Sequence, residues 1–320
     1  MRITLASICS SSFGLLLLFV CSGPPSSFAA SFQDTQNLFT RSISAPPSPP
    51  SAAVIAEYQR AYALIFNAHA GADYISALPL LRFSASQHFA PAEFLLGYLY
   101  EHGQGVPADY GQAAEHYRAA ASLGHSGAEN NLGGLYQYGR GISKDVKLAF
   151  QCYQAAAEHG NAIGQYNLAT FYYLGWATPP DAVAAAKWFR AAADQGLAPA
   201  QANLALFYFK GTGVPLDYAQ SAHWASLAAQ QGLPHAAMNY AYLCEHGMGV
   251  PRDYVSAYLW YSRAVAGGDK SGASHLKSVA HYLSRQQLQQ ANTQLAADAS
   301  RSRPPDATAA SGDITLFEHP

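Results

Sequence analysis

Charged residues are scarce in this sequence of 320 residues. Asp, Glu, Lys and Arg together make up 12% of the chain, whereas a typical soluble domain contains about 25%. The 18 basic and 20 acidic residues give a formal net charge of -2. A strongly basic surface for nucleic acid is therefore excluded, as is a polybasic patch for membranes. Because 50% of the residues are hydrophobic, a chain that is disordered throughout is excluded as well.

Motifs that carry catalysis are also missing. The sequence has no His-Glu-x-x-His pair for zinc, no glycine-rich loop followed by Lys-Ser or Lys-Thr for phosphate, and no Gly-x-Ser-x-Gly nucleophile turn. Its 12 histidines show no spacing that is typical of a metal site. We therefore expect a protein that is not an enzyme, with no catalytic residues, no cofactor and no metal.

Long hydrophobic runs are lacking after the first thirty residues, so no membrane span is expected there. Residues 1–29 carry a single charge, Arg2, followed by the apolar run 13–21 and by small residues at Ser27 and Ala29. The run is shorter than the roughly 20 residues that span a bilayer, and this order of features is typical of a cleavable signal peptide. We expect cleavage near Ala29 and a periplasmic or secreted protein. An uncleaved N-terminal anchor and a location in the ER lumen remain alternatives.

Two further segments lack the pattern of a packed core. Residues 30–55 are rich in Ser and Pro, which predicts an extended linker. Residues 300–320 mix polar residues with adjacent prolines, which predicts a disordered tail.

The region between these segments repeats with a period of 36 residues. Five copies keep the register without an insertion: 92–127, 128–163, 164–199, 200–235 and 236–271. When the first residue of each copy is counted as position 0, glycine stands at positions 11 and 32 and aspartate at position 17 in all five. Residues 56–91 form a degenerate N-terminal copy, and 272–299 are expected to form capping helices, because the ends of an array must cover its core.

Each copy predicts two helices. Apolar or small residues at positions 0, 4, 7 and 8 lie on one face of a first helix, which the glycine at position 11 ends. The aspartate at position 17 is expected to cap a second helix. That helix carries small and aromatic residues at positions 21, 24, 25 and 28 and ends at the glycine of position 32. After the copies, Ser284 to Gln287 has the form of a capping box and predicts one more helix.

Cysteine is equally scarce in the repeats, where only Cys152 and Cys244 occur. They stand at positions 24 and 8, where other copies have aromatic residues. Because they belong to the second and fifth copies, they are too far apart for a disulfide. We expect buried free thiols.

The residues 131–142, Asn-Leu-Gly-Gly-Leu-Tyr-Gln-Tyr-Gly-Arg-Gly-Ile, with Asp145 and Gly160 after them, carry a family resemblance. This pattern resembles a Sel-one-like repeat, a relative of the tetratricopeptide repeats, over 92–271 and more weakly over 56–91. The resemblance implies an all-α fold, a right-handed solenoid of αα-hairpins. It also implies a non-enzymatic scaffold that binds other proteins, and exported bacterial members resemble regulators of envelope processes, signalling or host contact.

One cysteine-rich branch of that family offers an alternative function. Its repeats each contain a disulfide, and some of its members are described as penicillin-binding or β-lactamase proteins. The corresponding cysteine pairs are absent from this sequence. An envelope hydrolase of the β-lactamase type, or a peptidoglycan-binding protein, therefore stays as the second hypothesis.

A candidate binding face lies opposite the core side of the first helices, at positions 2, 6, 9 and 10. A solvated face should be charged there, yet this one is mostly aromatic, and position 3 at its edge is Asn in four copies. We predict that this Tyr/Asn face captures another protein or an extended peptide segment. Its residues are Phe94, Tyr98, Asn131, Tyr138, Tyr166, Asn167, Tyr173, Asn203, Phe209, Asn239 and Tyr242, with Glu101 and Glu245 at its ends.

Two alternatives to this face remain open. The asparagines could bond the backbone of the neighbouring repeat instead of a peptide. The aromatic side chains could pack within the array, which would leave partners to the second helices or to the ends.

Overall fold

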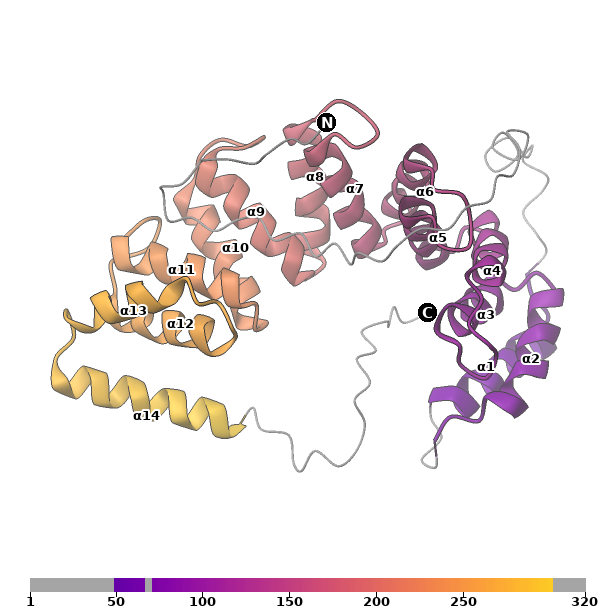
Figure 1. Cartoon of the computed structure of the whole chain (residues 1–320), viewed down its shortest axis with the longest axis horizontal. Coiled ribbons are helices and arrows are strands. Elements are labelled where there is room, and N and C mark those ends of the chain that lie inside the picture. Colours follow the sequence, from indigo (N-terminus) through magenta and orange to yellow (C-terminus); the bar gives the residue numbers. More distant parts are fainter. Residues whose placement is uncertain (1–48, 67–70, 302–320) are drawn as a thin grey trace, which may run out of the picture. The chain divides into compact units, whose positions relative to one another are not determined.

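The computed structural model describes residues 49–66 and 71–301, and these form helices without any strand (Figure 1). The helices are α1 (Ala52–Phe66), α2 (Tyr74–Ser86), α3 (Ala90–His102), α4 (Tyr110–Ser122), α5 (Ser126–Tyr138), α6 (Val146–Glu158), α7 (Ala162–Leu174), α8 (Ala182–Asp194), α9 (Ala198–Lys210), α10 (Tyr218–Gln230), α11 (Pro234–His246), α12 (Tyr254–Ala266), α13 (Gly272–Ala280) and α14 (Arg285–Arg301). The ten helices from α3 to α12 have 13 residues each. The fold is an all-α repeat solenoid, as predicted.

The ends of these helices follow from the repeated aspartates and glycines. The carboxylate of Asp109 accepts hydrogen bonds from the backbone N–H groups of Gly111 and Gln112 at 2.8 and 3.0 Å, which caps α4. Asp145, Asp181 and Asp253 cap their helices in the same way. At the other end, the first helices stop at glycines with φ near +66° to +69°, a left-handed conformation that side chains with a Cβ disfavour: Gly103, Gly139, Gly175, Gly211 and Gly247.

Within each unit, the core lies between helices that follow one another in the sequence. The predicted apolar stripe of the first helices is buried, with Leu96, Leu132, Leu168 and Leu204 at most 1% exposed. The second helices contribute alanines and the rings of Tyr117, Tyr153 and Phe189, none more than 3% exposed. Small residues let the backbones approach closely, and the rings fill the remaining space.

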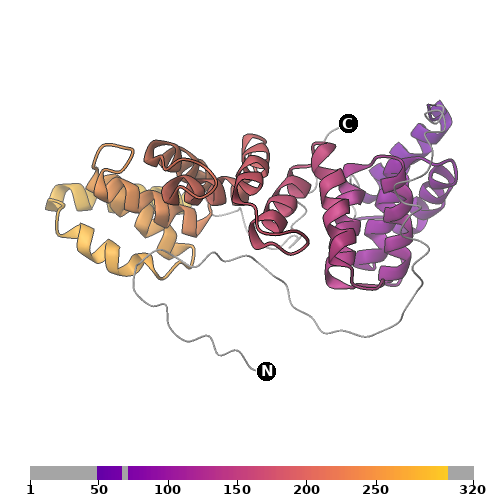
Figure 2. The ribbon, with the colours of Figure 1, turned by 90° about the horizontal axis from the view of Figure 1, so that it is seen from above.

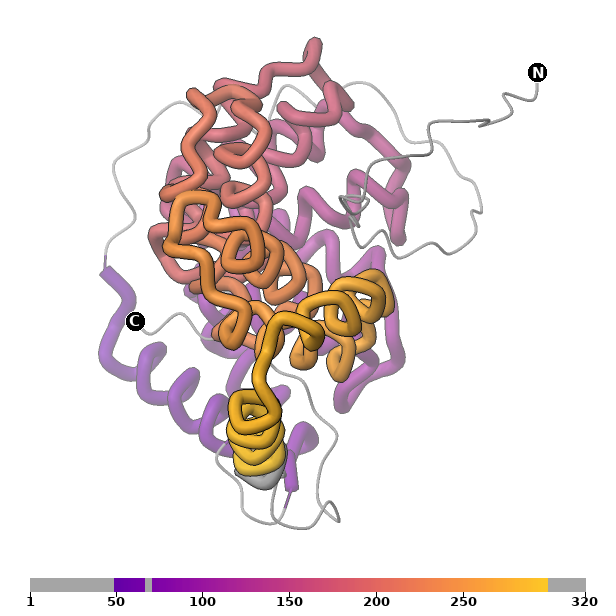
Figure 3. Tube along the Cα trace, turned by 90° about the vertical axis from the view of Figure 1, so that its left-hand side faces the viewer, coloured from indigo at the N-terminus to yellow at the C-terminus, as the bar shows by residue number. Residues whose placement is uncertain are grey.

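The helices fall into two compact units, which divide between Asp217 and Tyr218. In the first unit, α1 to α9 pack against their neighbours in sequence order, and Figure 2 shows α1 to α6 (indigo to magenta) side by side. In the second unit, α12 packs against α11, α13 and α14. Figure 3 shows α14 almost along its axis, after the turn that follows α13.

The last helix begins with the predicted capping box. Ser284 N–H donates to the amide oxygen of Gln287 at 2.9 Å, and Gln287 N–H donates to Ser284 Oγ at 3.2 Å. On its inner face Ala291 is 2% exposed, and Asn292 accepts a hydrogen bond from the hydroxyl of Tyr258 at 3.1 Å. The helix continues to Arg301, two residues past the predicted end of the capping region.

At the N-terminal side, α1 and α2 occupy the predicted degenerate copy. The first of them starts at Ala52, inside the predicted linker. The predicted signal peptide, most of that linker and the C-terminal tail lie outside the described residues. None of the described helices has the length and apolar character that crossing a membrane requires.

Candidate functional site

The Tyr/Asn face is only partly open to solvent. Of its eleven predicted residues, Tyr138 alone counts as exposed, with 41% of its surface accessible, while the other ten are half-buried. Nine of the eleven belong to the unit that ends at Asp217, and Asn239 and Tyr242 belong to the other unit. The half-buried side chains therefore contact other residues of their own unit.

Three of the asparagines hold neighbouring repeats together. The side-chain amide of Asn167 on α7 donates to the side-chain oxygen of Asn130 on α5 at 2.9 Å. Asn130 in turn donates to Asn131 at 3.2 Å, and Asn131 is hydrogen-bonded to the phenol of Tyr117. The partners in these hydrogen bonds are side chains, and not the backbone of the neighbouring repeat.

A second link of this kind joins the next pair of copies. Asn203 on α9 donates to the phenol oxygen of Tyr166 on α7 at 3.4 Å. Burial raises the pKa of Tyr166, so its phenol stays protonated at neutral pH. This half-buried tyrosine therefore connects two repeats as well as facing outward.

The aromatic side chains of the face are packed in the same manner. The ring of Phe94 stacks on His125, the residue that caps α5, with centroids 4.4 Å apart. The ring of Tyr166 lies 5.5 Å from Phe189, and the ring of Tyr173 lies 5.2 Å from Phe207. Each of these rings is thus fixed by a neighbour, while part of its surface remains accessible.

The histidines at the ends of first helices hold two more members of the face. His102 stacks on Tyr98, and His246 stacks on Tyr242, both with centroids 4.1 Å apart. Each histidine also bonds the carbonyl oxygen of that tyrosine at 2.9 Å through Nδ1. These side chains close the ends of α3 and α11.

The two glutamates expected at the ends of the face serve buried tyrosines. Glu101 accepts a hydrogen bond from the phenol of Tyr117, and Glu245 accepts one from Tyr261, both at 2.7 Å. Both tyrosines are fully buried, and burial raises their pKa values. These carboxylates therefore satisfy internal phenols.

The described residues contain little that could carry chemistry. No group of three or more His, Cys, Asp or Glu side chains among them could hold a metal ion. Cys152 and Cys244 are buried free thiols, as predicted, and burial raises their pKa values to about 12 and about 11. Since the thiolate is the nucleophilic form, these cysteines are poor nucleophiles.

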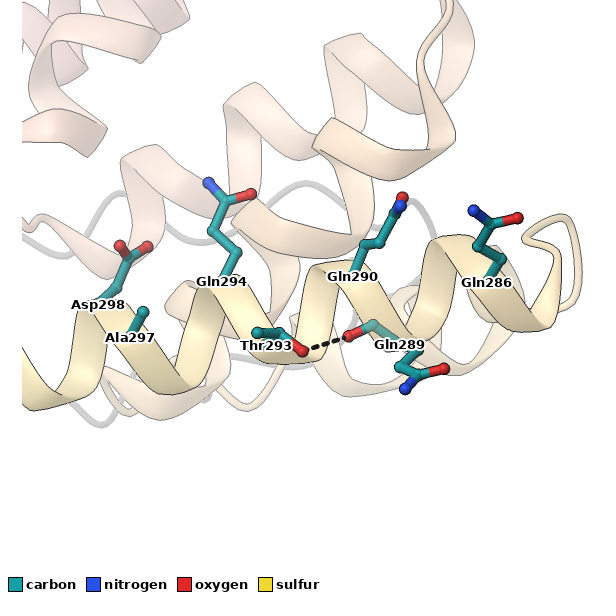
Figure 4. A pocket seen from close by; sticks show the side chains of 7 residues that line it. All are labelled: Gln286, Gln289, Gln290, Thr293, Gln294, Ala297 and Asp298. Carbon is teal, nitrogen blue, oxygen red and sulfur yellow. Dashed lines mark hydrogen bonds between the residues drawn. The ribbon is translucent and has the colours of Figure 1, made fainter.

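A cavity of about 700 Å³ lies along α14 (Figure 4). Figure 4 shows that Gln286, Gln290, Gln294 and Asp298 point to the same side of the helix. The lining is polar and, apart from Asp298, uncharged: Gln286, Gln289, Gln290, Thr293, Gln294, Ala297 and Asp298. This cavity involves none of the predicted face residues.

Several exposed large side chains were not predicted as part of a candidate site. They lie at the turns between the two helices of a copy and at the starts of second helices: Ile75, Tyr110, Trp176, Val183 and Leu216. A signal for them was present, because positions 12 to 19 lie outside the apolar stripes of both helices, although some apolar residues there, such as Ile142 and Val146, pack against the core. Figure 1 shows where these turns and helix starts fall along the chain.

Comparisons with known proteins agree with the repeat architecture. The Sel1 repeat model matches residues 90–125, 126–161, 162–197, 198–233 and 234–269. A solved Sel1 repeat protein from Oxalobacter formigenes is 28% identical, with 72% of this chain and 88% of that chain covered and a TM-score of 0.62. No curated protein matches the sequence.

Two more distant solved structures are also similar to this chain. One is c5321, a protective antigen from uropathogenic Escherichia coli, at 22% identity with 81% and 73% coverage of the two chains and a TM-score of 0.43. The other is an immunity protein from Pseudomonas aeruginosa at 18% identity, with 70% and 86% coverage and a TM-score of 0.42. The five consecutive matches occupy more than half of the chain, and the protein belongs to the Sel1 repeat family.

Proposed function

We propose that this protein is a non-enzymatic scaffold that binds another protein, or an extended segment of one, outside the cytoplasm. Sel1 repeat proteins act as protein-binding scaffolds. We further propose that its role lies in envelope regulation, signalling or host contact, in the periplasm or after secretion. The signal-like residues 1–29 support the location.

The observation that carries the proposal is the half-exposed aromatic row of the first unit. Phe94, Tyr166 and Tyr173 are each held by a neighbouring ring while part of their surface stays accessible. Side chains that are already ordered lose less entropy on binding, and tyrosine combines a large apolar area with a hydroxyl. Such a surface suits a protein segment better than a small charged ligand.

A double substitution tests this assignment. Tyr166→Ala with Tyr173→Ala should weaken the capture of partner proteins from the native envelope fraction about tenfold or more, because two half-buried anchors are removed. Tyr282→Ala, which removes a tyrosine that is 62% exposed in the other unit, is the matched control and should change little. The helical circular dichroism signal must be equal in all three proteins.

Two results would count against the proposal. Capture that survives the double substitution at full strength removes the Tyr/Asn face as the binding site. Turnover of a chromogenic β-lactam or of muropeptides by the purified protein contradicts the non-enzymatic role. The location is tested separately by cell fractionation and by sequencing the mature N-terminus, for which we expect Ala30 as the first residue.

A further inference from the structure

The turn between α5 and α6 presents an ordered group of cationic and aromatic side chains. The guanidinium carbon of Arg140 lies 5.4 Å from the ring centroid of Tyr138 and 5.9 Å from that of Tyr110. Tyr138 and Tyr110 are 41% and 37% exposed. One arginine is thus held over two exposed rings from neighbouring copies, an arrangement that orders the guanidinium while leaving it accessible.

Two exposed lysines extend this positive charge. Lys144 and Lys147 follow Arg140 within the same turn and the first residues of α6. The carboxylate of Asp145 between them is committed to the backbone N–H groups of Lys147 and Leu148 at 2.9 and 3.0 Å. Within the described part of the chain, none of the three cations takes part in an ion pair.

Other arginines of the same unit contrast with this group. Arg118 donates to the phenol of Tyr136 at 3.3 Å, and Arg190 donates to the phenol of Tyr208. Arg60 pairs with Glu57 at 2.9 Å. Arg140, Lys144 and Lys147 are therefore three cations gathered at one turn without a carboxylate partner in the described part of the unit.

The turn itself is held in place by backbone contact. Gly139 and Gly141 both have a φ that requires glycine, +69° and +67°. A Cβ at Gly141 would lie 2.3 Å from the carbonyl carbon of Tyr110, so the backbone of the turn is in close contact with the start of α4. The cations are consequently displayed on a rigid support and not on a free loop.

The next turn along the unit supplies apolar surface. Trp176 is 41% exposed, and its ring is fixed 5.1 Å from that of Phe171. Its neighbour Ala177 and Val146, the first residue of α6, both pack against the same core cluster. Val183, which is 67% exposed, continues the apolar side chains at the start of α8.

We propose that this turn surface, formed by Tyr110, Tyr138, Arg140, Lys144 and Lys147 with Trp176 on the next turn, docks an acidic protein segment. Carboxylates of the partner pair with the three cations, and an apolar side chain of the partner packs on Trp176. Charge complementarity argues for an acidic occupant. Exposed apolar side chains together with only three cations argue for a protein segment over a nucleic acid or a sulfated glycan.

This inference rests on the proposed scaffold function and shares only Tyr138 with the Tyr/Asn face. The Tyr/Asn face depends on Tyr166 and Tyr173, whereas the turn surface depends on Arg140, Lys144 and Lys147. Loss of one kind of binding therefore does not imply loss of the other.

The experiment measures the fluorescence anisotropy of a labelled peptide made of Glu-Glu-Leu repeats, added to the full-length mature chain. The variant Lys144→Glu with Lys147→Glu should weaken binding about tenfold or more, because attraction becomes repulsion. The matched control is Lys187→Glu with Lys210→Glu, which makes the same change in net charge at two other exposed lysines of the unit. We expect the control to stay within about twofold. Arg140→Ala should give an intermediate loss.

Several outcomes overturn the proposal. Equal weakening by the two lysine pairs shows a general charge effect, and equal binding of a Lys-Lys-Leu peptide shows no preference for acid. A heparin hexasaccharide that binds this turn more tightly than the peptide identifies a glycan site instead. If the Lys144→Glu, Lys147→Glu protein binds the peptide as tightly as the unchanged protein does, this result also contradicts the proposal. Tyr166→Ala with Tyr173→Ala should leave peptide binding unchanged, which separates this test from that of the scaffold function.

Discussion

The phenol of Tyr117 on α4 donates a 2.7 Å hydrogen bond to the carboxylate of Glu101 on α3, the facing helix of its own copy. The same link recurs at 2.7 Å between Tyr153 and Gln137 in the second copy, with an uncharged acceptor. In the third copy both positions change together, since Phe189 and Tyr173 stand there. Donor and acceptor are therefore matched within a copy, because a buried phenol without a partner would cost free energy.

Replacing Tyr117 by phenylalanine tests this match. Tyr117→Phe should lower the free energy of unfolding by about 1.5–3 kcal/mol, the usual contribution of a hydrogen bond to a charged group. Tyr153→Phe, which removes the equivalent bond to a neutral amide, should cost only about 0.5–1.5 kcal/mol. Urea unfolding of both variants measures the difference. Equal losses would show that the charge of Glu101 adds nothing to this bond.

The close approach of successive repeats at Gly141 can be tested with a single methyl group. Gly141→Ala places a Cβ 2.3 Å from the carbonyl carbon of Tyr110 and keeps a positive φ. Gly160→Ala meets no atom within 4 Å at its φ of +87° and pays only the conformational cost. We expect a loss of about 1–2 kcal/mol for the control and an additional loss of about 1–3 kcal/mol for Gly141→Ala. Thermal and urea unfolding compare the two, and indistinguishable variants would contradict the contact.

Low pH should reduce the free energy of unfolding, partly because His125 becomes protonated. Its Nδ1 accepts the backbone N–H of Ala128 at 3.2 Å and so caps α5, which requires the neutral ring. Burial lowers the pKa of His125, so the unfolded chain binds the proton more readily than the folded one. The contribution to stability is complete above the ordinary histidine pKa of about 6.5 and is lost as the pH falls through that value.

Asparagine is the natural replacement for this test. Asn161 stands at the same position of the next copy and caps α7 through Gly164 N–H at 2.7 Å. His125→Asn should therefore reduce the difference in unfolding free energy between about pH 7.5 and pH 5, because the amide does not titrate. An unchanged pH dependence would show that His125 does not contribute to it.

The capping box of α14 predicts a local effect. Ser284→Ala removes the hydroxyl that accepts Gln287 N–H and should destabilise the start of this helix by about 1 kcal/mol. Amide hydrogen exchange within α14 should become faster while exchange in the first unit stays the same. Ser122→Ala, at an exposed serine of α4, serves as the control and should leave α14 unaffected.

Features that depend on neighbours along the chain could be predicted without coordinates. The caps at Asp109 and Asp145, the left-handed glycines and the capping box at Ser284 all involve groups within a few residues. The buried face of the first helices could also be predicted, because hydrophobic periodicity reports directly on burial. The free state of Cys152 and Cys244 followed from their places in different copies.

The sequence located the candidate face but did not show which residues its side chains contact. Nothing in the periodicity shows that Asn167 reaches Asn130, 37 residues earlier, or that Asn203 reaches Tyr166. These contacts depend on how one hairpin is rotated against the next. The exposed rings of Tyr110 and Tyr138, with Arg140 over them, come from two copies and could not be paired for the same reason.

By itself, the sequence determined the length of the repeat, the caps that end the helices of the five copies and the side that is buried, because capping and periodicity act within one or two helical turns. The tertiary structure decided which polar and aromatic side chains of the outer face hold repeats together and which stay accessible. The physical reason is distance along the chain: a side chain at the edge of a helix contacts the next copy only after both hairpins have packed. Tyr166 and Tyr138 were both placed on the predicted face, yet they differ in exposure.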